Sequence, residues 1–221
     1  MDRIRTEADI AAALDRLGAA DPLLAAARAG VEDVPLRLFD ADFAGMCRIV
    51  AGQQLSTQSA AAVYAKVCRA FDPLTAEAIL TADDGVLRAA GLSRQKAATF
   101  RAVAGAVAGG LDLAALAELP AEEARTSLEA IRGIGRWSAD LYLMFCAGHP
   151  DVFPVGDLAV RRGAQRALGL GEEPAPDALD AIAARWSPDR STAARLMWAV
   201  YRLDRPATTV GQTAVPEGAP L

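Results

Sequence analysis

The sequence predicts an all-α fold, and three observations lead to this prediction. Apolar residues recur at the three- and four-residue spacing of an amphipathic helix in nearly every segment. No stretch alternates apolar and polar residues cleanly enough to form a strand. Gly, Pro, Ser and Asp separate the helical segments at short intervals, and none of these boundaries resembles a long linker. A chain of 221 residues can bury either one large core or two smaller ones.

Each predicted helix lies between residues that start or stop helices. The stretch that follows Ser56 is the clearest, because a serine caps its start and Ala60, Val63 and Val67 share one face. The residues before Phe39 also have helical character. Further helices are predicted over Phe43 to Gly52, Thr75 to Ala82, Asp83 to Ala90, Ser93 to Ala108, Pro120 to Ile131, Trp137 to Ala147, Asp157 to Leu168, Pro176 to Trp186 and Arg190 to Leu203.

The composition indicates a soluble protein. Hydrophobic residues make up 52% of the chain, yet no apolar run reaches the length of about 18 residues that crosses a bilayer. The first residues, MDRIRTEADI, are charged and amphipathic, and they lack the apolar centre of a secretory signal. We therefore expect no membrane association and a location inside the cell, in the cytoplasm or nucleoid of a prokaryote.

The cysteines and the histidine do not form a metal-binding pattern. Cys47, Cys68 and Cys146 lie in apolar surroundings without CxxC spacing, which favours reduced, buried thiols. A cubane iron-sulfur cluster needs four cysteine ligands, so no such cluster is expected. His149 has no His or Cys at ligand spacing, and we interpret it as a loop residue.

The net charge speaks against nucleic-acid binding but does not exclude it. The chain carries 23 Lys and Arg against 28 Asp and Glu, which gives a net charge of −5, whereas nucleic-acid binders are usually basic. Screening at physiological salt limits charge effects to about 8 Å, so local charge matters more than the total. A contact face can still be positive.

The most informative stretch runs from Leu128 to Asp140 and reads LEAIRGIGRWSAD, a helix, a Gly-Ile-Gly hairpin and a second helix. Gly133 and Gly135 lack a Cβ, so the backbone can adopt positive φ and approach a phosphate, toward which the following helix directs N–H groups. Arg132 and Arg136 flank the turn and add positive charge. Such backbone contacts bind DNA without reading its sequence. An ordinary αα-hairpin turn is the alternative interpretation.

Two further segments favour the DNA-binding interpretation. Trp137 follows the hairpin, and Asp157 comes twenty positions later in DVFPVGDLAVRRG, just before another predicted helix. The segment VAGQQLS, from Val50 to Ser56, precedes both. Together these motifs resemble the helix-hairpin-helix (HhH-GPD) superfamily of base-excision DNA glycosylases, over roughly residues 35 to 205. Within it the chain is most similar to the 3-methyladenine DNA glycosylase II branch.

The resemblance implies two helical domains with the DNA-binding cleft between them. The central domain would span residues 39–150 and contain the helix-hairpin-helix at 128–140. Residues 1–38 and 151–205 would form the second domain, which carries the catalytic Asp. No separate N-terminal β domain is expected, and residues 206–221, rich in Pro, Gly and Thr, are expected to be a flexible tail.

The resemblance also implies the reaction. Members of this branch hydrolyse the N-glycosidic bond of alkylated bases in double-stranded DNA, and they act as monomers. Bifunctional members carry a Lys where this chain has Trp137, and a Schiff base with the sugar requires that amine. We therefore expect a monofunctional glycosylase with no AP-lyase activity and no cofactor for catalysis.

By this resemblance, Asp157 is the catalytic carboxylate that stabilises the oxocarbenium-like sugar and activates water. Its position before a helix also suits an N-cap, and the two roles can coexist. Trp137 and Trp198 match aromatic positions of the base pocket, and Tyr142 lies one residue beyond a third. A core position is the alternative for Trp198.

The remaining expected contacts are to the DNA backbone and to an ion. Gln54 matches the residue that fills the gap left by a flipped nucleotide, with a buried or capping glutamine as the alternative, and Gln53 is a second candidate. The hairpin residues Arg132, Gly133, Gly135 and Arg136 would bind DNA, and Arg94 and Lys96 could add phosphate contacts. The resemblance implies a Na⁺ or K⁺ ion on the backbone carbonyls of Glu129, Ile131 and Ile134.

Two other classes of function remain open at this point. One is a non-catalytic protein that uses the hairpin to bind DNA structure or damage. The other is a helical protein with no role on DNA, in which Gly-Ile-Gly is only a turn.

Overall fold

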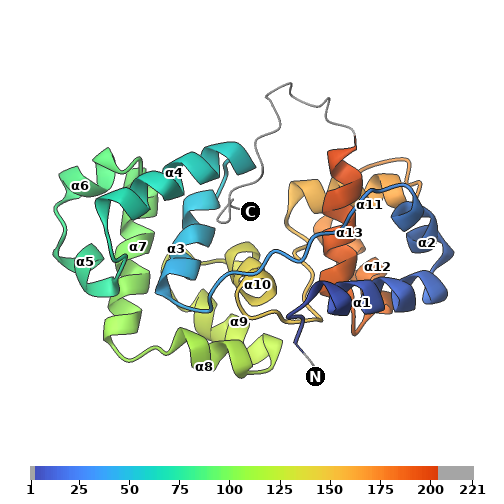
Figure 1. Ribbon diagram of the computed structural model, residues 1–221, viewed down its shortest axis with the longest axis horizontal. Helices are drawn as coiled ribbons and strands as arrows, with labels where there is room; N and C mark the ends of the chain where they lie inside the picture. The colour runs from blue at the N-terminus through green and yellow to red at the C-terminus, as the bar shows by residue number, and fades with distance from the viewer. Residues whose placement is uncertain (1–2, 204–221) are drawn as a thin grey trace. The chain divides into compact units, whose positions relative to one another are not determined.

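A computed structural model of the chain describes residues 3–203 (Figure 1). Every regular element in this part of the chain is helical, which confirms the predicted all-α class. The residues divide into two compact units. We call residues 39–147 the central unit, and residues 3–38 together with 148–203 the terminal unit. The tail predicted over 206–221 lies outside the described residues.

The division between the units falls three residues before the expected boundary. The sequence assigned residues 148–150 to the central domain, whereas they group with the terminal unit. Hydrogen bonds explain the difference: the Gly148 carbonyl accepts from the N–H of Ile4 at 2.8 Å, and the His149 carbonyl accepts from Oγ of Ser191 at 2.7 Å. The Pro150 carbonyl accepts from the N–H of Ser191 at 2.9 Å.

The terminal unit is built around its last helix. Its elements are α1 (Glu7–Ala20), α2 (Pro22–Ala29), α11 (Leu158–Ala167), α12 (Pro176–Ala183), the short 3₁₀ helix η1 (Ala184–Trp186) and α13 (Arg190–Arg202). Helix α13, red in Figure 1, packs against α1, α2 and α11 and is buried along most of its length. This burial stabilises the unit through the hydrophobic effect.

The central unit consists of the helices from the middle of the chain. Its elements are α3 (Phe43–Gly52), α4 (Thr57–Ala70), α5 (Ala76–Thr81), α6 (Asp84–Ala89), α7 (Arg94–Ala108), α8 (Leu113–Glu118), α9 (Ala121–Glu129) and α10 (Arg136–Phe145). Helix α3 packs against α4, α7 and α10, and α9 packs against α10 (Figure 1). Side chains such as Met46, Ile49 and Phe100 are fully buried and form the core.

Most predicted helices are present, and one was missed. Helix α8 was not expected, because its sequence LAALAE is short and follows Gly109 and Gly110. Asp112 caps its start by accepting a hydrogen bond from the N–H of Ala115 at 2.9 Å. Within residues 3–203 no helix combines the length and the apolar character that a membrane span requires.

The burial of the cysteines and the loop position of the histidine largely match the predictions. All three cysteines are free; Cys47 and Cys146 are buried, whereas Cys68 is half-buried, contrary to expectation. Burial raises the pKa of the Cys47 thiol well above its usual value. His149 lies in a loop, as predicted, and its Nδ1 accepts a hydrogen bond from the N–H of Asp151 at 3.2 Å.

Candidate functional site

Asp157 lies at the start of α11 in the terminal unit. Its Oδ1 accepts a hydrogen bond from the backbone N–H of Val160 at 3.0 Å, which confirms the predicted N-cap. The same oxygen accepts a hydrogen bond from Nε1 of Trp198 at 3.0 Å. Two donors from different helices therefore fix the orientation of this carboxylate, while the side chain remains partly exposed. The arrangement leaves an oriented acidic group that can face a ligand.

Trp198 is not an ordinary core residue. It is half-buried within a stretch of α13 whose other residues, from Ser191 to Val200, are buried. Its indole N–H donates a hydrogen bond to Asp157, so the edge of the ring contacts the carboxylate. The sequence left open whether this tryptophan belongs to the core, and the structure gives it a contact with the predicted catalytic residue.

A glycine sets the spacing between the helices that carry these two residues. Gly163 on α11 faces the backbone of α13, and a Cβ at this position would lie 2.0 Å from the carbonyl oxygen of Met197. Only glycine permits such an approach, because any side chain would push the helices apart. Met197 directly precedes Trp198 in the chain. The close packing at Gly163 therefore helps to bring the Trp198 indole within hydrogen-bond distance of Asp157.

The predicted hairpin joins α9 to α10 in the central unit. Gly133 has φ +91°, and a Cβ there would lie 2.1 Å from Oγ1 of Thr99, so this position requires glycine for two reasons. Gly135 differs from the prediction, because its φ of −109° is accessible to any residue and a Cβ would meet nothing within 4 Å. At Gly135 the missing side chain leaves the protein backbone open to an approaching molecule.

Helix α10 begins without a hydrogen bond from a capping side chain, since Gly135 occupies its N-cap position. The first N–H groups of a helix have no partner within the helix, and they bind anions readily. Arg132 and Arg136 beside this turn are both exposed. The hairpin thus combines the features that suit a phosphate group.

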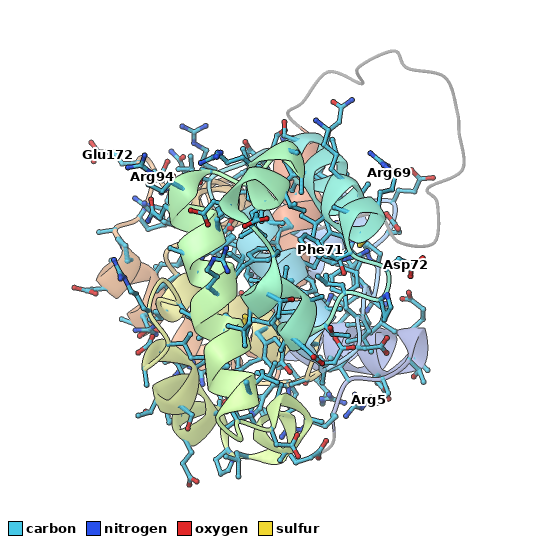
Figure 2. The ribbon with its side chains drawn as sticks, turned by 90° about the vertical axis from the view of Figure 1, so that its left-hand side faces the viewer. Arg5, Arg69, Phe71, Asp72, Arg94 and Glu172 are labelled. Carbon is cyan, nitrogen blue, oxygen red and sulfur yellow. The ribbon has the colours of Figure 1, made fainter. Side chains whose placement is uncertain are left out.

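Of the two basic residues predicted at the start of α7, one is exposed and one is used within the protein. Figure 2 shows Arg94 pointing outward from the first turn of this helix, in agreement with its exposure. Lys96 instead donates a hydrogen bond from Nζ to the carbonyl oxygen of Ala51 at 2.8 Å, and burial lowers the pKa of its ammonium group. This contact at the end of α3 does not fit the phosphate role suggested for Lys96.

The two adjacent glutamines have different environments. Gln53 is half-buried, and its side-chain Nε2 donates hydrogen bonds to the carbonyl oxygen of Gly133 at 3.1 Å and to Oγ of Ser138 at 2.9 Å. A contact of Gln53 with DNA stays a prediction, and within the protein its amide N–H groups bind the hairpin. Gln54 is exposed and has φ +58°, in the left-handed region.

The aromatic residues near the hairpin also differ from one another. Trp137 is half-buried in the first turn of α10. Tyr142, in contrast, is fully buried in the central unit, and its hydroxyl donates a hydrogen bond to the carbonyl oxygen of Leu113 at 3.1 Å. The prediction that Tyr142 lines a base pocket is wrong, because α10 is buried on every side from Ser138 to Phe145 and Tyr142 lies within the core.

The expected cation ligands lie at the hairpin. Glu129 is the last residue of α9, and the carbonyl oxygen of Ile131 accepts one hydrogen bond, from the N–H of Ile134, at 3.0 Å. A carbonyl oxygen has two lone pairs, so the Ile131 carbonyl retains one for an ion. The hairpin fits a monovalent cation to this extent. Side chains do not add a second site, since residues 3–203 contain no cluster of three or more His, Cys, Asp or Glu residues arranged to hold a metal.

A buried ion pair, which the sequence did not predict, links the two helices of the hairpin motif. Nε of Arg125 on α9 lies 2.7 Å from Oδ1 of Asp140 on α10, and both side chains are buried. Oδ2 of Asp140 has no hydrogen-bond partner, although Nε of Arg136 lies 3.7 Å from it. Burial raises the pKa of Asp140 to about 6, and the neighbouring Arg125 limits this rise.

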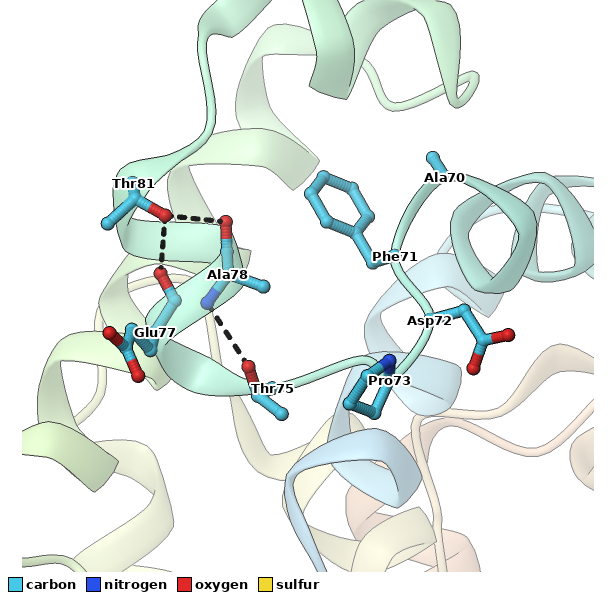
Figure 3. A pocket seen from close by; sticks show the side chains of 8 residues that line it. All are labelled: Ala70, Phe71, Asp72, Pro73, Thr75, Glu77, Ala78 and Thr81. Atoms are coloured by element: carbon cyan, nitrogen blue, oxygen red, sulfur yellow. Dashed lines mark hydrogen bonds between the residues drawn. The ribbon is translucent and has the colours of Figure 1, made fainter.

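The predicted site residues do not line either of two surface hollows. One, of about 420 Å³, lies in the central unit between the end of α4 and α5, and Figure 3 shows the ring of Phe71 facing across it. Asp72 and Glu77 line this hollow, and their negative charges oppose phosphate binding. The other hollow, of about 560 Å³, lies in the terminal unit beside α1 and α2.

Comparison with known proteins adds to this geometry. Residues 47–189 match the family model described as HhH-GPD superfamily base excision DNA repair protein. The protein YfjP of Bacillus subtilis is 34% identical over 90 residues, which cover 41% of this chain and only 31% of YfjP. The alkylbase DNA glycosidase-like protein mag2 of Schizosaccharomyces pombe is 25% identical over 75% of this chain and 80% of its own.

A solved structure supports the same assignment. The 3-methyladenine DNA glycosylase Mag1 of Schizosaccharomyces pombe, in complex with abasic DNA, superimposes with a TM-score of 0.78 and 27% identity. The match covers 84% of this chain and 94% of the Mag1 chain. The family match spans well over half of the sequence and includes the hairpin, Trp137 and Asp157. The chain therefore belongs to the HhH-GPD superfamily of base excision DNA repair proteins.

Proposed function

We propose that this chain is a monofunctional DNA glycosylase that removes alkylated bases of the 3-methyladenine type. The observation that carries the proposal is the carboxylate of Asp157, whose Oδ1 is held by the N–H of Val160 and by Nε1 of Trp198. The names of mag2 and of Mag1 support the same class of substrate. In this proposal the protein acts as a monomer on double-stranded DNA that contains damaged bases.

The proposed reaction is a hydrolysis at C1′ of the deoxyribose. The bond from C1′ to the base nitrogen breaks, and the base leaves with the electron pair. An ionised Asp157 stabilises the positive charge that develops on the sugar. A water molecule then forms the new bond to C1′, and Asp157 accepts the proton that this water loses. An alkylated purine carries a positive charge before the reaction and leaves as a neutral base, so it needs little acid catalysis.

The flipped base would stack on exposed aromatic surface. Trp137 and Trp198 are both half-buried, so each presents part of its ring. A cationic base over an indole gains about 0.5–2 kcal/mol from cation–π attraction, which a neutral base does not. This difference gives a physical reason for a preference for alkylated purines.

The hairpin would bind the DNA backbone. Gly135 and the first N–H groups of α10 suit a phosphate, and Arg132 and Arg136 add positive charge beside them. Contacts of this kind explain how a chain with a net charge of −5 can bind DNA. Gln54, exposed on the turn after α3, would fill the space left by the flipped nucleotide.

Two further features belong to the proposal. Catalysis needs no cofactor, whereas the carbonyls of Glu129, Ile131 and Ile134 would hold a Na⁺ or K⁺ ion that bridges the hairpin to a phosphate. The protein would not cut the strand, because Trp137 stands where bifunctional relatives carry the Schiff-base lysine. Borohydride treatment during the reaction would therefore trap no covalent adduct with DNA.

The decisive experiment is the release of free bases from methylated DNA, separated by chromatography, with Asp157→Asn beside the wild type. Asparagine caps a helix about as well as aspartate, so the variant keeps the start of α11 and loses only the negative charge. Asp112→Asn is the matched control, since Asp112 is an exposed N-cap of α8. We expect methyladenine release by the wild type and the control, and none by Asp157→Asn.

The other outcomes have distinct meanings. Binding to damaged DNA without release of any base would favour a non-catalytic damage-binding protein. DNA affinity that is absent, or that does not fall as salt rises, would contradict phosphate binding by the hairpin.

A further inference from the structure

The side chain of Gln53 links the turn between α3 and α4 to the hairpin. Gln53, the C-cap of α3, donates from Nε2 to the carbonyl oxygen of Gly133 at 3.1 Å and to Oγ of Ser138 at 2.9 Å. These partners lie 80 and 85 positions away in the sequence, on the hairpin and in the first turn of α10. Both partners belong to the central unit, as Gln53 does.

The residue that follows is held in a strained conformation. Gln54 has φ +58°, and a non-glycine residue in the left-handed region costs about 1–2 kcal/mol. The N–H of Leu55 donates to the carbonyl oxygen of Gly52 at 3.1 Å, so the turn is tight. Nζ of Lys96 also holds the end of α3, through the carbonyl oxygen of Ala51 at 2.8 Å. The strain persists because surrounding contacts fix the turn.

The same hydrogen bonds fix the hairpin. The peptide between Gly133 and Ile134 accepts a bond from Gln53 at its carbonyl and donates one from its N–H to the Ile131 carbonyl at 3.0 Å. Its orientation is thereby set on both sides, just before Gly135 and the start of α10. A shift of the hairpin would move the turn that carries Gln54, and a shift of the turn would move the hairpin.

We propose that Gln53 is a positioning residue that couples the hairpin, which holds the DNA backbone, to Gln54, which fills the gap left by the flipped nucleotide. This inference rests on the proposed function. Flipping a nucleotide costs a few kcal/mol of stacking and pairing, and a filling residue that is already in place adds no further ordering cost. The two hydrogen bonds of Gln53 fix the distance between the bound phosphate and the side chain that enters the duplex.

The coupling predicts a specific pattern of effects. The Gln53 amide is not among the proposed phosphate-binding groups, but its loss loosens the hairpin, so the affinity for undamaged duplex should fall less than nucleotide flipping does. Nucleotide flipping in duplex DNA should fall by about tenfold, which corresponds to about 1.4 kcal/mol and to the loss of two neutral hydrogen bonds. Single-stranded DNA has no gap to fill, so excision from it should change less than about twofold.

The test compares Gln53→Met, which keeps the length of the side chain and removes its N–H groups, with wild type. Gln58→Met is the matched control, because Gln58 is exposed on α4. Nucleotide flipping is followed by the fluorescence of 2-aminopurine placed beside a methylated base, which requires no bond cleavage. Single-turnover excision is measured on duplex and on single-stranded DNA. Hydrogen exchange of the free protein is measured for residues 52–57 and 131–137.

The expected result is faster exchange in both segments of Gln53→Met, together with loss of flipping and excision in duplex DNA only. A double variant with Ser138→Ala should be close to Gln53→Met alone, because both changes remove the same contact. Unchanged exchange in either segment, or equal losses on duplex and single strands, would overturn the coupling. A wild type that neither flips nor releases any base would instead overturn the proposed function, and the role of Gln53 on DNA with it.

Discussion

The indole N–H of Trp198 donates a hydrogen bond to Oδ1 of Asp157 at 3.0 Å, and this bond joins α13 to the start of α11. The terminal unit contains a second pair of the same kind, in which Nε1 of Trp186 donates to Oδ2 of Asp21 at 3.0 Å. Trp186 is only 2% exposed, whereas Trp198 is half-buried. The two pairs therefore allow a role in catalysis to be separated from a role in stability.

Trp198→Phe should lower the rate of base excision while the protein remains folded. The change keeps an aromatic ring and removes the donor that orients Asp157. A hydrogen bond to a charged group contributes about 1.5–3 kcal/mol, so we expect kcat to fall by about 10- to 100-fold. Steady-state release of methyladenine at saturating DNA measures kcat. Trp186→Phe, the control, should lower the melting temperature and leave kcat of the folded protein near wild type; equal kcat values in the two variants would contradict the prediction.

Gly163→Ala should damage both stability and activity. The added methyl group would lie 2.0 Å from the carbonyl oxygen of Met197, a backbone atom that cannot rotate away. Overpacking of this kind costs about 1–3 kcal/mol, and separating α11 from α13 would lengthen the bond from Trp198 to Asp157. Urea unfolding and excision kinetics check the two effects.

Gly105→Ala provides the comparison, because a Cβ at this position of α7 would meet nothing within 4 Å. Alanine in an exposed helix position should stabilise the protein by about 0.4–1 kcal/mol. A Gly163→Ala protein as stable and active as wild type would show that the helices can separate without cost.

Alanine substitutions at the two hairpin glycines should have different effects, one on stability and the other on DNA binding. Gly133→Ala would be destabilised, because φ is +91° and the methyl group would lie 2.1 Å from Oγ1 of Thr99. Gly135→Ala should fold normally, since its φ of −109° is allowed and its surroundings are open. If a phosphate approaches this backbone, the new methyl group would weaken DNA binding. Melting temperature and salt-dependent affinity distinguish these effects, and unchanged affinity in Gly135→Ala would argue against a phosphate at this position.

Asp140 should make the stability of the protein depend on pH. Burial raises the pKa of its carboxyl to about 6, whereas the pKa in an unfolded chain is about 3.9. Between these values the folded protein holds a proton that the unfolded chain has released, so the free energy of unfolding falls as pH rises. The contribution of this group is complete below about pH 4 and is lost as pH rises through about 6.

The check is urea unfolding of wild type and Asp140→Asn at several pH values. Asparagine does not titrate, so the stability of wild type relative to the variant should fall between pH 4 and 6, by no more than about 1.4 kcal/mol per pH unit. A difference that rises over this range would show that the ion pair with Arg125 outweighs the effect of burial.

The sequence was sufficient for features that depend on local pattern. Helical periodicity and capping residues predicted most helices and the N-cap at Asp157, whereas the catalytic role of Asp157 was implied by the resemblance to the glycosylase family. The short helix α8 was not predicted, because six residues after a Gly-Gly pair show too little periodicity. Tyr142 was placed in the base pocket by the resemblance, one residue beyond the matching position, and the sequence did not show that α10 is buried on every side from Ser138 to Phe145.

The contacts that build the site depend on residues far apart in the chain. The bond from Trp198 to Asp157 spans 41 positions, and the bond from Gln53 to Ser138 spans 85. Gly163 and Asp140 carry no sequence signal of their own, because a glycine or an aspartate within a helix is common. By itself, the sequence determined the class of fold, the hairpin and the acidic group. Only the packed tertiary structure decided which side chains hold them, because hydrogen bonds form between the atoms that packing brings within about 3 Å.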